Sequence, residues 1–272
     1  MQINHKLIAE DTLKIIDTGY YINHKNEKVE IKQLTDNAVN GTQLYTPAQL
    51  EELTEKWHPA KTFTTQFEVT AETTLNAVRK LATETKDILC LNFASAKNPG
   101  GGFLGGAVAQ EESIARASAL YPCLLTAPGY YQFHRSQRTC LYSDHMIYSP
   151  AVPVFKHENG SLMHEAVLTS IITSPAVNAG VVRRNEPGNS DKILPAMKNR
   201  MEKMLSLCAS RKHTNLVLGA WGCGVFQNEP EEIAELFEYF LKGKFAGAFQ
   251  RVTFAVKSNN EKFINPFRKR FL

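Results

Sequence analysis

Two adjacent glutamates, Glu111 and Glu112, follow a glycine-rich loop in this chain of 272 residues. The loop comes after an apolar stretch at residues 88–94 and contains five glycines in the seven residues 100–106. Glycine takes positive φ without strain and lets backbone N–H groups approach a ligand closely. The N-terminus of the following helix adds unpaired N–H donors and favours phosphate. The segment therefore predicts a phosphate-binding loop with a carboxyl group on its rim that can donate a proton.

The same residues also fit two simpler interpretations. A glycine run is common in flexible turns, and carboxylates in a first helical turn complement the helix dipole without any chemistry. The loop lacks the lysine and the serine or threonine of a GxxxxGK[ST] phosphate loop, and it does not fit the GxGxxG pattern well. The sequence therefore disfavours a P-loop nucleotidase and a dinucleotide cofactor.

A second glycine-rich loop lies at residues 219–228, after an expected strand at residues 216–218. Ligands of open α/β sheets bind beyond the carboxyl ends of the strands, so both loops are expected at the same edge. Their free N–H groups could then hold a diphosphate without lysine or metal. The glycines concerned are Gly100, Gly101, Gly102, Gly222 and Gly224. A side chain at Gly101 or Gly224 is expected to disturb a positive-φ geometry and to crowd the phosphate.

The string NPGGGFLGGAVAQEESIAR resembles the signature of bacterial-type poly(ADP-ribose) glycohydrolases (PARGs). That signature is a triple glycine, a short spacer, here residues 103–109, and the triplet Gln110-Glu111-Glu112. Two further segments match the family, SPAVNAG at residues 174–180 and GAWGCGVFQN at residues 219–228. The resemblance spans roughly residues 60–257, whereas the first 60 residues and the last 15 carry no recognisable motif.

The resemblance gives the two glutamates different tasks. Ordinary glycosidases place two carboxylates on opposite sides of the scissile bond. Glu111 and Glu112 cannot easily do so, because neighbouring helical residues point about 100° apart. The family implies that Glu112 protonates the leaving hydroxyl and then activates water, whereas Glu111 hydrogen-bonds ribose or orders the loop. The substrate diphosphate can help to stabilise the oxocarbenium-like transition state.

The resemblance also implies residues that bind the substrate. Phe226 is expected to press the distal ribose into position, with Val225 beside it in the binding loop. Asn98 could bind the distal ribose hydroxyls and Asn178 could line the adenosine side, although both residues also fit turns. Gln110 is expected at the site in a mainly structural role.

The implied activity is hydrolysis of the ribose–ribose O-glycosidic bond of poly(ADP-ribose), with release of ADP-ribose from chain ends. ADP-ribosylated protein is the implied partner, no cofactor is implied, and a role in the DNA damage response is expected. Three other interpretations stay open: a non-enzymatic module that binds ADP-ribose, a hydrolase of single ADP-ribose units on protein or nucleic acid, and a nucleotide- or phosphate-binding α/β protein that resembles the family only in its loops. A binding module needs no acid at Glu111 and Glu112.

Residues with metal-ligating side chains show no recognisable site. His134, Cys140, Asp144 and His145 lie close together in the sequence, but their spacing fits no zinc pattern. No GxSxG nucleophile elbow is present. Cys223 lies in the second glycine-rich loop without an indicated histidine partner, so a packing role is expected.

The composition is ordinary for a globular protein, with 43% hydrophobic and 21% charged residues. No apolar run approaches the ~20 residues that span a bilayer, and the N-terminal residues show no signal peptide. The five cysteines include no CxxC pair, which favours a reducing cytoplasm. The net charge of +4 weakly favours an anionic substrate and gives no indication of duplex DNA binding.

Strands and helices alternate from residue 63 onward. Strands are expected at residues 63–69, 88–94, 167–172, 216–218 and 252–256, and helices at residues 75–82, 192–209 and 230–241. This order predicts a three-layer α/β fold with a mixed, mainly parallel sheet, and the resemblance narrows it to a macrodomain-like fold. The helix at residues 192–209 carries a stripe that is typical of a core face: Leu194, Met197, Met201, Met204 and Cys208.

Residues 1–62 are expected to form an extension that packs on a catalytic domain at residues 63–272, as one globular unit. The pattern predicts a helix at residues 5–16 and a hairpin from residues 20–22 and 28–31. A second helix is expected from Pro47 to about Trp57, with Thr46 as its cap.

Overall fold

The computed structural model describes residues 4–58 and 62–272. Residues 1–3, part of the N-terminus in which no signal peptide was expected, lie outside the described residues. Residues 59–61, next to the expected domain boundary, also lie outside them. In the part that the structure describes, no helix is both long enough and apolar enough to cross a membrane.

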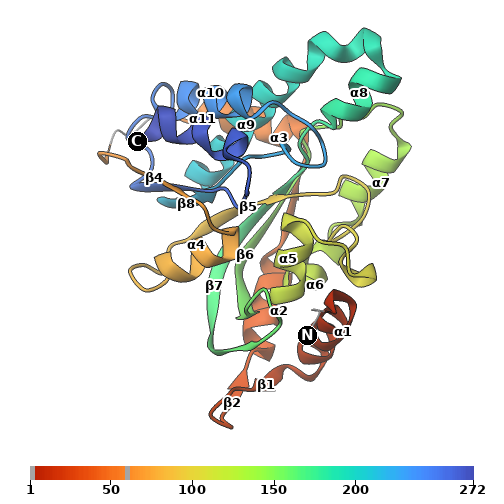
Figure 1. The fold of residues 1–272 in the computed structure, drawn as a ribbon, viewed down its shortest axis with the longest axis vertical. Coiled ribbons are helices and arrows are strands. Elements are labelled where there is room, and N and C mark those ends of the chain that lie inside the picture. The colour runs from red at the N-terminus through yellow and green to blue at the C-terminus, as the bar shows by residue number, and fades with distance from the viewer. Residues whose placement is uncertain (1–3, 59–61) are drawn as a thin grey trace.

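A mixed seven-stranded sheet forms the centre of the protein (Figure 1). Its order is β3-β6-β7-β5-β8-β9-β4, and the neighbours from β7 to β4 are parallel. β6 pairs with β7, and β3 with β6, in the antiparallel sense. The prediction of a mixed, mainly parallel sheet is therefore confirmed. The strands are β3 (Gln43–Tyr45), β4 (Gln66–Thr70), β5 (Leu89–Phe93), β6 (Met146–Lys156), β7 (Leu162–Ser174), β8 (Asn215–Leu218) and β9 (Arg251–Ala255).

Helices cover both faces of this sheet and complete three layers (Figure 1). One face carries α3 (Pro47–Lys56), α9 (Ile193–Ser210), α10 (Pro230–Leu241) and α11 (Glu261–Phe271). The other carries α1 (His5–Thr18), α2 (Lys32–Gly41), α4 (Thr74–Leu81), α5 (Gln110–Ala117), α6 (Leu120–Leu125) and α7 (Pro128–Ser136). Shorter elements lie in the connections: α8 (Ala179–Asn185) and the 3₁₀ helices η1 (Phe103–Gly105) and η2 (Pro187–Lys192).

The central strand β5 shows why this sequence forms a covered sheet. Leu89 and Leu91 belong to the buried cluster on the α9 side, whereas Cys90 belongs to the cluster on the α4 side. Alternate residues of a strand point to opposite faces, so a strand covered on both faces needs apolar residues throughout. Asn92 is the exception and is fully buried. Its amide must therefore find partners inside the protein.

Most of the elements that were predicted from residue 63 onward are present within a few residues of their expected bounds, with two differences. The strand β6 and the helices α6, α7, α8 and α11 were not predicted. β4 begins at Gln66 and not at residue 63, because Phe63 N and Thr65 Oγ1 donate to the turn before β9, at Gly247 O and Phe249 O. Within the expected stripe of α9, Leu194 is 39% exposed. The remaining members are fully buried: Met197, Met201, Met204 and Cys208.

The first 58 residues contribute directly to the main sheet. The predicted hairpin forms from β1 (Tyr20–Ile22) and β2 (Lys28–Glu30), and Thr46 caps α3 as predicted. β3 then pairs with β6 at the sheet edge. α1 packs against the first glycine-rich loop, where Phe103 and Ala9 share a small buried cluster. The division into an extension and a catalytic domain at residue 62 stays a prediction.

Candidate active site

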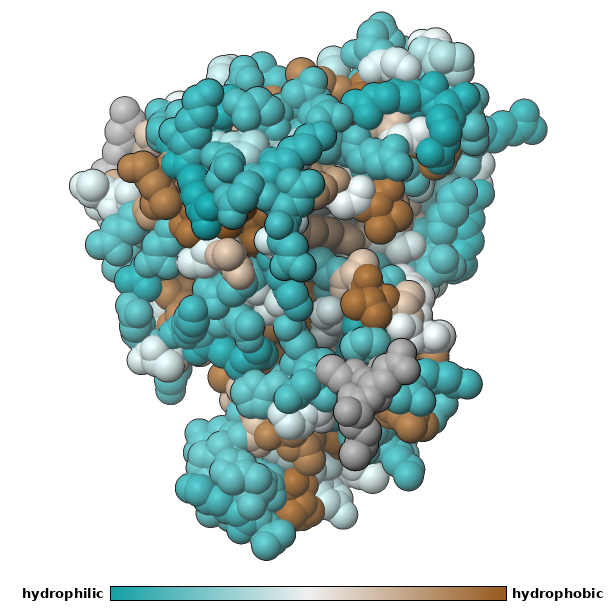
Figure 2. All heavy atoms as spheres, viewed as in Figure 1, coloured by the Kyte–Doolittle hydropathy of each residue, from teal (hydrophilic) through white to brown (hydrophobic). Residues whose placement is uncertain are grey.

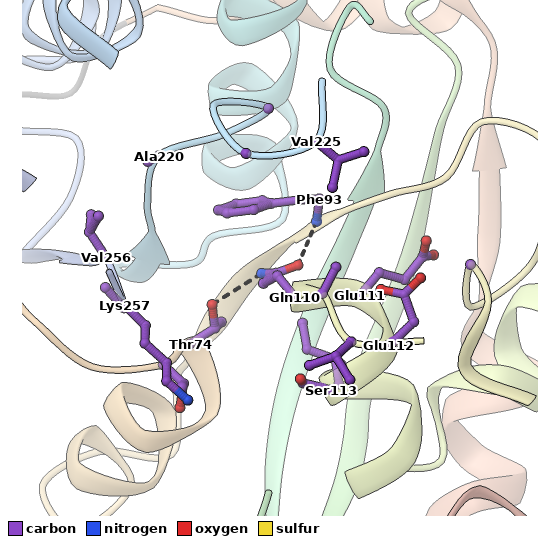
Figure 3. A pocket seen from close by; sticks show the side chains of 18 of the residues that line it. Thr74, Phe93, Gln110, Glu111, Glu112, Ser113, Ala220, Val225, Val256 and Lys257 are labelled. Carbon is purple, nitrogen blue, oxygen red and sulfur yellow. Dashed lines mark hydrogen bonds between the residues drawn. The ribbon is translucent and has the colours of Figure 1, made fainter. Parts of the chain in front are cut away.

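Five parallel strands end at one cavity of about 790 Å³ (Figure 3). Its walls include a residue from the segment after each strand: Ser95 after β5, Ala176 after β7, Ala220 after β8, Val256 after β9 and Thr73 after β4. Ligands of open α/β sheets bind at this edge. The two glycine-rich loops, called here the first loop (residues 98–106) and the second loop (residues 219–228), both contribute to the walls. The cavity is therefore the candidate active site.

Glu111 and Glu112 lie next to each other in the first turn of α5, but their carboxylates have different surroundings (Figure 3). Glu111 is 3% exposed, and its oxygens accept hydrogen bonds from Ser95 N at 2.6 Å and from Asn92 Nδ2 at 3.2 Å. Both residues line the cavity, and Glu112 Oε1 accepts from Gly102 N at 2.9 Å. Its Oε2 has no donor among the described residues. Glu111 is thus held by the protein, whereas Glu112 keeps an oxygen for a ligand.

Burial raises the pKa of Glu111 to about 8. The N–H of Ser95 and the amide of Asn92 oppose this shift, because both donate to the ionised carboxylate. Glu112, when it is ionised, acts in the same direction as burial and raises the pKa of Glu111 further. Glu111 therefore keeps its proton at neutral pH.

This raised pKa predicts that Glu111 makes the protein less stable as the pH rises from about 4.5 to about 8. Below this range, the carboxyl group is protonated in both the folded and the unfolded state. Within it, the unfolded state loses its proton first, so the free energy of unfolding falls by up to about 1.4 kcal/mol per pH unit. Above it, both states are ionised, and this group causes no further loss.

Urea unfolding of the parent protein and of Glu111→Gln across this pH range measures the effect. Glutamine does not titrate, so the parent is expected to lose stability relative to the variant as the pH rises. Glu165→Gln, which removes an exposed charge on β7, is the control and should leave the parent's pH dependence unchanged. Parallel stability curves for the parent and Glu111→Gln would contradict the raised pKa.

The first loop closes around the two carboxylates at Gly101. This residue has φ +61°, and a Cβ added to it would lie 2.9 Å from Glu112 Cδ and 3.1 Å from Glu111 Oε2. Only glycine fits there without moving the acids. The N–H groups of this loop are largely used inside the protein: Gly101 N donates to Asn98 O, and Gly102 N to Glu112. The expectation that this loop supplies many free donors to a diphosphate is therefore wrong.

The second loop does have free donors. The N–H groups of Gly222, Gly224, Val225 and Phe226 make no hydrogen bond within the described part of the chain. Asn228 fixes the shape of this loop, because its Nδ2 donates to Val177 O at 2.8 Å and to Gly222 O at 3.1 Å. Successive backbone N–H groups in a turn form an anion-binding concavity.

The two expected glycines of this loop differ. Gly222 has φ +74°, and a Cβ there would lie 2.6 Å from Asn228 Nδ2. Gly224 does not have positive φ, and a Cβ there would meet nothing within 4 Å. The expected strain at Gly224 is therefore absent, because the chain turns at Gly222.

Gln110 lines the cavity, but its amide is bound to the protein (Figure 3). Its Oε1 accepts from Phe93 N at 2.8 Å, and its Nε2 donates to Leu91 O at 2.7 Å and to Thr74 Oγ1 at 3.1 Å. These bonds join the start of α5 to the end of β5 and to α4. Gln110 thus holds the glutamates in place.

The other expected binding residues divide into two groups. Asn98, Val225 and Phe226 line the cavity, and Val225 is 79% exposed. Gly100 and Asn178 are not part of its lining. Asn178 instead caps α8, where its side-chain oxygen accepts from Val181 N at 3.2 Å. Asn178 therefore behaves as a residue that shapes a turn, which was the alternative expectation. Its position does not support contact with the adenosine of the ligand.

Several residues of the site were not among the sequence candidates. Asn92 holds Glu111, and its signal was present as the one polar residue in an apolar strand. Phe93 and Lys257 line the cavity from the ends of β5 and β9. Phe263 at the start of α11 also lines it, whereas Phe267 is fully buried in the core. Only the assembled sheet brings these residues together.

The described residues contain no group of three or more histidine, cysteine, aspartate and glutamate side chains that could hold a metal ion. The sequence cluster around His134 is a polar network, in which Ser143 Oγ lies 2.9 Å from His134 Nε2 and 2.7 Å from His145 Nδ1. Asp144 instead pairs with Arg200 and Lys203.

Comparisons with solved structures place this architecture among known proteins. PARG from Thermomonospora curvata is 42% identical, with a TM-score of 0.95 over 99% of this chain and 100% of that one. PARG from the same organism bound to the inhibitor ADP-HPD gives a TM-score of 0.92 with the same identity and coverage. PARG from Deinococcus radiodurans in complex with ADP-ribose is 44% identical, with a TM-score of 0.84 over 89% of this chain and 98% of that one.

Comparisons of the sequence agree with the structural ones. No curated protein matches the chain. A family model described as the catalytic domain of microbial-type PARG matches residues 9–157, which is more than half of the chain. The chain therefore belongs to the family of microbial-type PARG catalytic domains.

Proposed function

We propose that this protein is a poly(ADP-ribose) glycohydrolase that hydrolyses the ribose–ribose O-glycosidic bond and releases ADP-ribose from chain ends. The observation that carries the proposal is the position of Glu112, which lines the cavity with one carboxylate oxygen free. A module that only binds ADP-ribose needs no acid there. Family membership and the ADP-ribose bound to the Deinococcus radiodurans protein support this class of ligand.

In the proposed reaction, Glu112 acts first as an acid and then as a base. It gives its proton to the oxygen of the leaving unit as the bond between this oxygen and the anomeric carbon of the distal ribose breaks. The substrate diphosphate stabilises the positive charge that develops on the ribose. Water then adds to the anomeric carbon, and Glu112 takes up the proton that the water releases. General acid–base catalysis of this kind contributes about 10²–10⁴-fold.

The binding of the ADP-ribose unit follows from the two loops. We assign the diphosphate to the free N–H groups of the second loop, at Gly222, Gly224 and Val225. The distal ribose then lies between Phe226 and the glutamates, within reach of Asn98. Glu111 and Gln110 act through the positions that they give to the first loop and to α5.

The activity is tested by incubation of the protein with poly(ADP-ribosyl)ated protein and identification of the product by mass spectrometry. We expect ADP-ribose, and we expect its release to survive EDTA, because the described residues offer no group of ligands for a metal. Binding without release would favour a binding module. Release from singly modified protein but not from polymer would favour a hydrolase of single ADP-ribose units.

Phe226→Ala is expected to lower the turnover of polymer by about 10²-fold, because a displacement of the reacting group by ~1 Å has this effect. Phe226 is only partly buried, so the melting temperature should fall less than the activity does. Val225→Ala, at the exposed neighbouring position, is the control for changes to the loop itself. A Phe226→Ala protein that calorimetry finds unfolded would assign this ring to the core.

We also infer that the protein acts in a reducing compartment such as the cytoplasm, since all five cysteines are free. Its proposed partners are poly(ADP-ribose) and ADP-ribosylated proteins. A role in the DNA damage response stays a prediction.

A further inference from the structure

Four exposed cations lie in or beside the segments that carry or support the two loops: Lys97, Arg138, Arg183 and Arg184. We call them the catalytic-end cations. None of them forms an ion pair in the part of the chain that the structure describes, in contrast to surface cations such as Arg268, which pairs with Glu261 at 2.7 Å. Arginine presents a planar group of donors that matches phosphate geometry. A set of unpaired cations is therefore suited to an anion.

The second loop holds one of these arginines, Arg183, whose Nη1 donates to Gln227 O at 3.0 Å. Gln227 directly follows Phe226, which lines the cavity. Arg184 is the next residue of α8 and is exposed. Hydrophilic side chains cover the corner at which α7 and α8 lie (Figure 2). The charge of α8 therefore stands next to the catalytic end of the cavity.

The segment that follows Arg138 is bound to Glu186, the residue after α8. Glu186 accepts hydrogen bonds from Thr139 Oγ1 and from Cys140 N, the two residues after Arg138. A third bond comes from Asn189 Nδ2 at 3.1 Å. These bonds occupy the Glu186 carboxylate within the protein, so it forms no ion pair with the neighbouring arginines.

Lys97 approaches from the opposite wall. It is exposed and precedes Asn98, which lines the cavity from the first loop. Lys97 beside Asn98 and Arg183 beside Phe226 therefore bring positive charge to the lining of both loops.

The direction of that chain follows from the proposed function, on which this inference rests. The ADP-ribose unit to be released fills the cavity, with its distal ribose at Glu112. The rest of the polymer is attached to the oxygen that Glu112 protonates, so it extends away from the cavity at the catalytic end. Each further unit of the polymer carries two phosphates. We propose that the catalytic-end cations bind the diphosphate of the leaving unit.

Exposed cations interact with phosphate in a way that salt screens strongly. The proposal therefore predicts two linked properties. The KM for polymer should rise with ionic strength, and this dependence should weaken when the arginines are neutralised. The affinity for free ADP-ribose, which lacks the leaving unit, should depend much less on them.

The test compares Arg138→Gln/Arg184→Gln with Lys14→Gln/Lys25→Gln. Both double variants lose two positive charges, but Lys14 and Lys25 lie on α1 and in the β1–β2 hairpin, and both are exposed. Arg183 stays unchanged, because it holds the second loop. Steady-state kinetics on polymer of defined length gives KM and kcat at low and high salt. Calorimetry with ADP-ribose measures the integrity of the cavity.

For the arginine variant, we expect the KM for long polymer to rise roughly tenfold at low salt, since each exposed pair has a modest effect. The slope of log KM against log salt should fall by about one per arginine. ADP-ribose affinity should stay within about twofold of the parent, as it should in the lysine control.

An arginine variant with the same polymer KM and salt slope as the lysine control would overturn the proposal. Inhibition of the parent by single-stranded DNA that is lost in the arginine variant, with an unchanged polymer KM, would assign the surface to nucleic acid and also overturn it. A parent that releases no ADP-ribose would instead contradict the proposed function.

Discussion

Glu112→Gln is expected to abolish the release of ADP-ribose while the protein still binds it. Glutamine has the same shape and keeps an oxygen that can accept from Gly102 N, so the first loop should stay in place. It has no proton to give to the leaving oxygen and cannot accept one from water. We expect turnover to fall by at least about 10²–10⁴-fold. The dissociation constant for ADP-ribose should change by less than about tenfold, or ~1.4 kcal/mol.

Single-turnover assays on polymer and calorimetry with ADP-ribose measure these two quantities. Glu165→Gln controls for the loss of one negative charge outside the cavity. Glu111→Gln is expected to be damaging too, but for a different reason. Its carboxyl group is bonded to Ser95 and Asn92, so the variant should lose ADP-ribose affinity together with turnover. Undiminished turnover in a pure Glu112→Gln preparation would remove Glu112 from the role of acid.

The catalytic segment could be predicted because its signal is local. The strand at residues 89–93, the glycines and the glutamates follow one another within 24 residues, from residue 89 to residue 112. Helix geometry argues against two opposed carboxylates, because neighbouring helical residues point about 100° apart, and the family resemblance supplies the separate tasks of Glu111 and Glu112. In the structure both residues line the cavity, and Glu111 is the buried one of the two.

The long strand β6 could not be predicted from local patterns. It contains Pro150 and Pro153, and proline is usually excluded from sheet interiors because it has no N–H to donate. The structure accommodates Pro150 at a register shift between Ser149 and Val152 in the pairing with β7, where Ala151 takes φ +45°. Pro153 stays in register opposite Leu168. A pattern search that excludes proline from strands therefore misses β6.

The donors that we propose for the diphosphate could not be predicted from the sequence either. Glycine content indicates that an N–H group can approach a ligand, but not whether another residue already uses it. In the first loop, Asn98 O and Glu112 use the N–H groups of Gly101 and Gly102. In the second loop, the N–H groups of Gly222 and Gly224 stay free among the described residues. The difference arises from contacts that form only after folding.

The second large expected effect is at Gly101, where the first loop closes around the two carboxylates. Gly101→Ala should reduce turnover by about 10²-fold or more, since a shift of ~1 Å at the reacting groups has that effect. The left-handed conformation at φ +61° disfavours alanine by roughly 1–2 kcal/mol. The new Cβ would also press on Glu112 Cδ at 2.9 Å and on Glu111 Oε2 at 3.1 Å. The loop or the acids must move, and no charged group has been removed.

Gly105→Ala is the matched control, because it adds the same methyl group to the same loop outside the cavity lining. Its Cβ meets nothing within 4 Å, and Gly105 does not have positive φ. Its turnover should therefore stay within about twofold of the parent, since an alanine with ordinary backbone geometry leaves the loop in place. Kinetics on polymer and thermal unfolding of both variants give the comparison. Equal losses in the two proteins would mean that any side chain in this loop disturbs the site. A fully active Gly101→Ala protein would mean that the acids do not need the geometry seen here. The expected result, a loss at Gly101 alone, places the strained and crowded position of the site between the two glutamates, where the reacting ribose is proposed to bind.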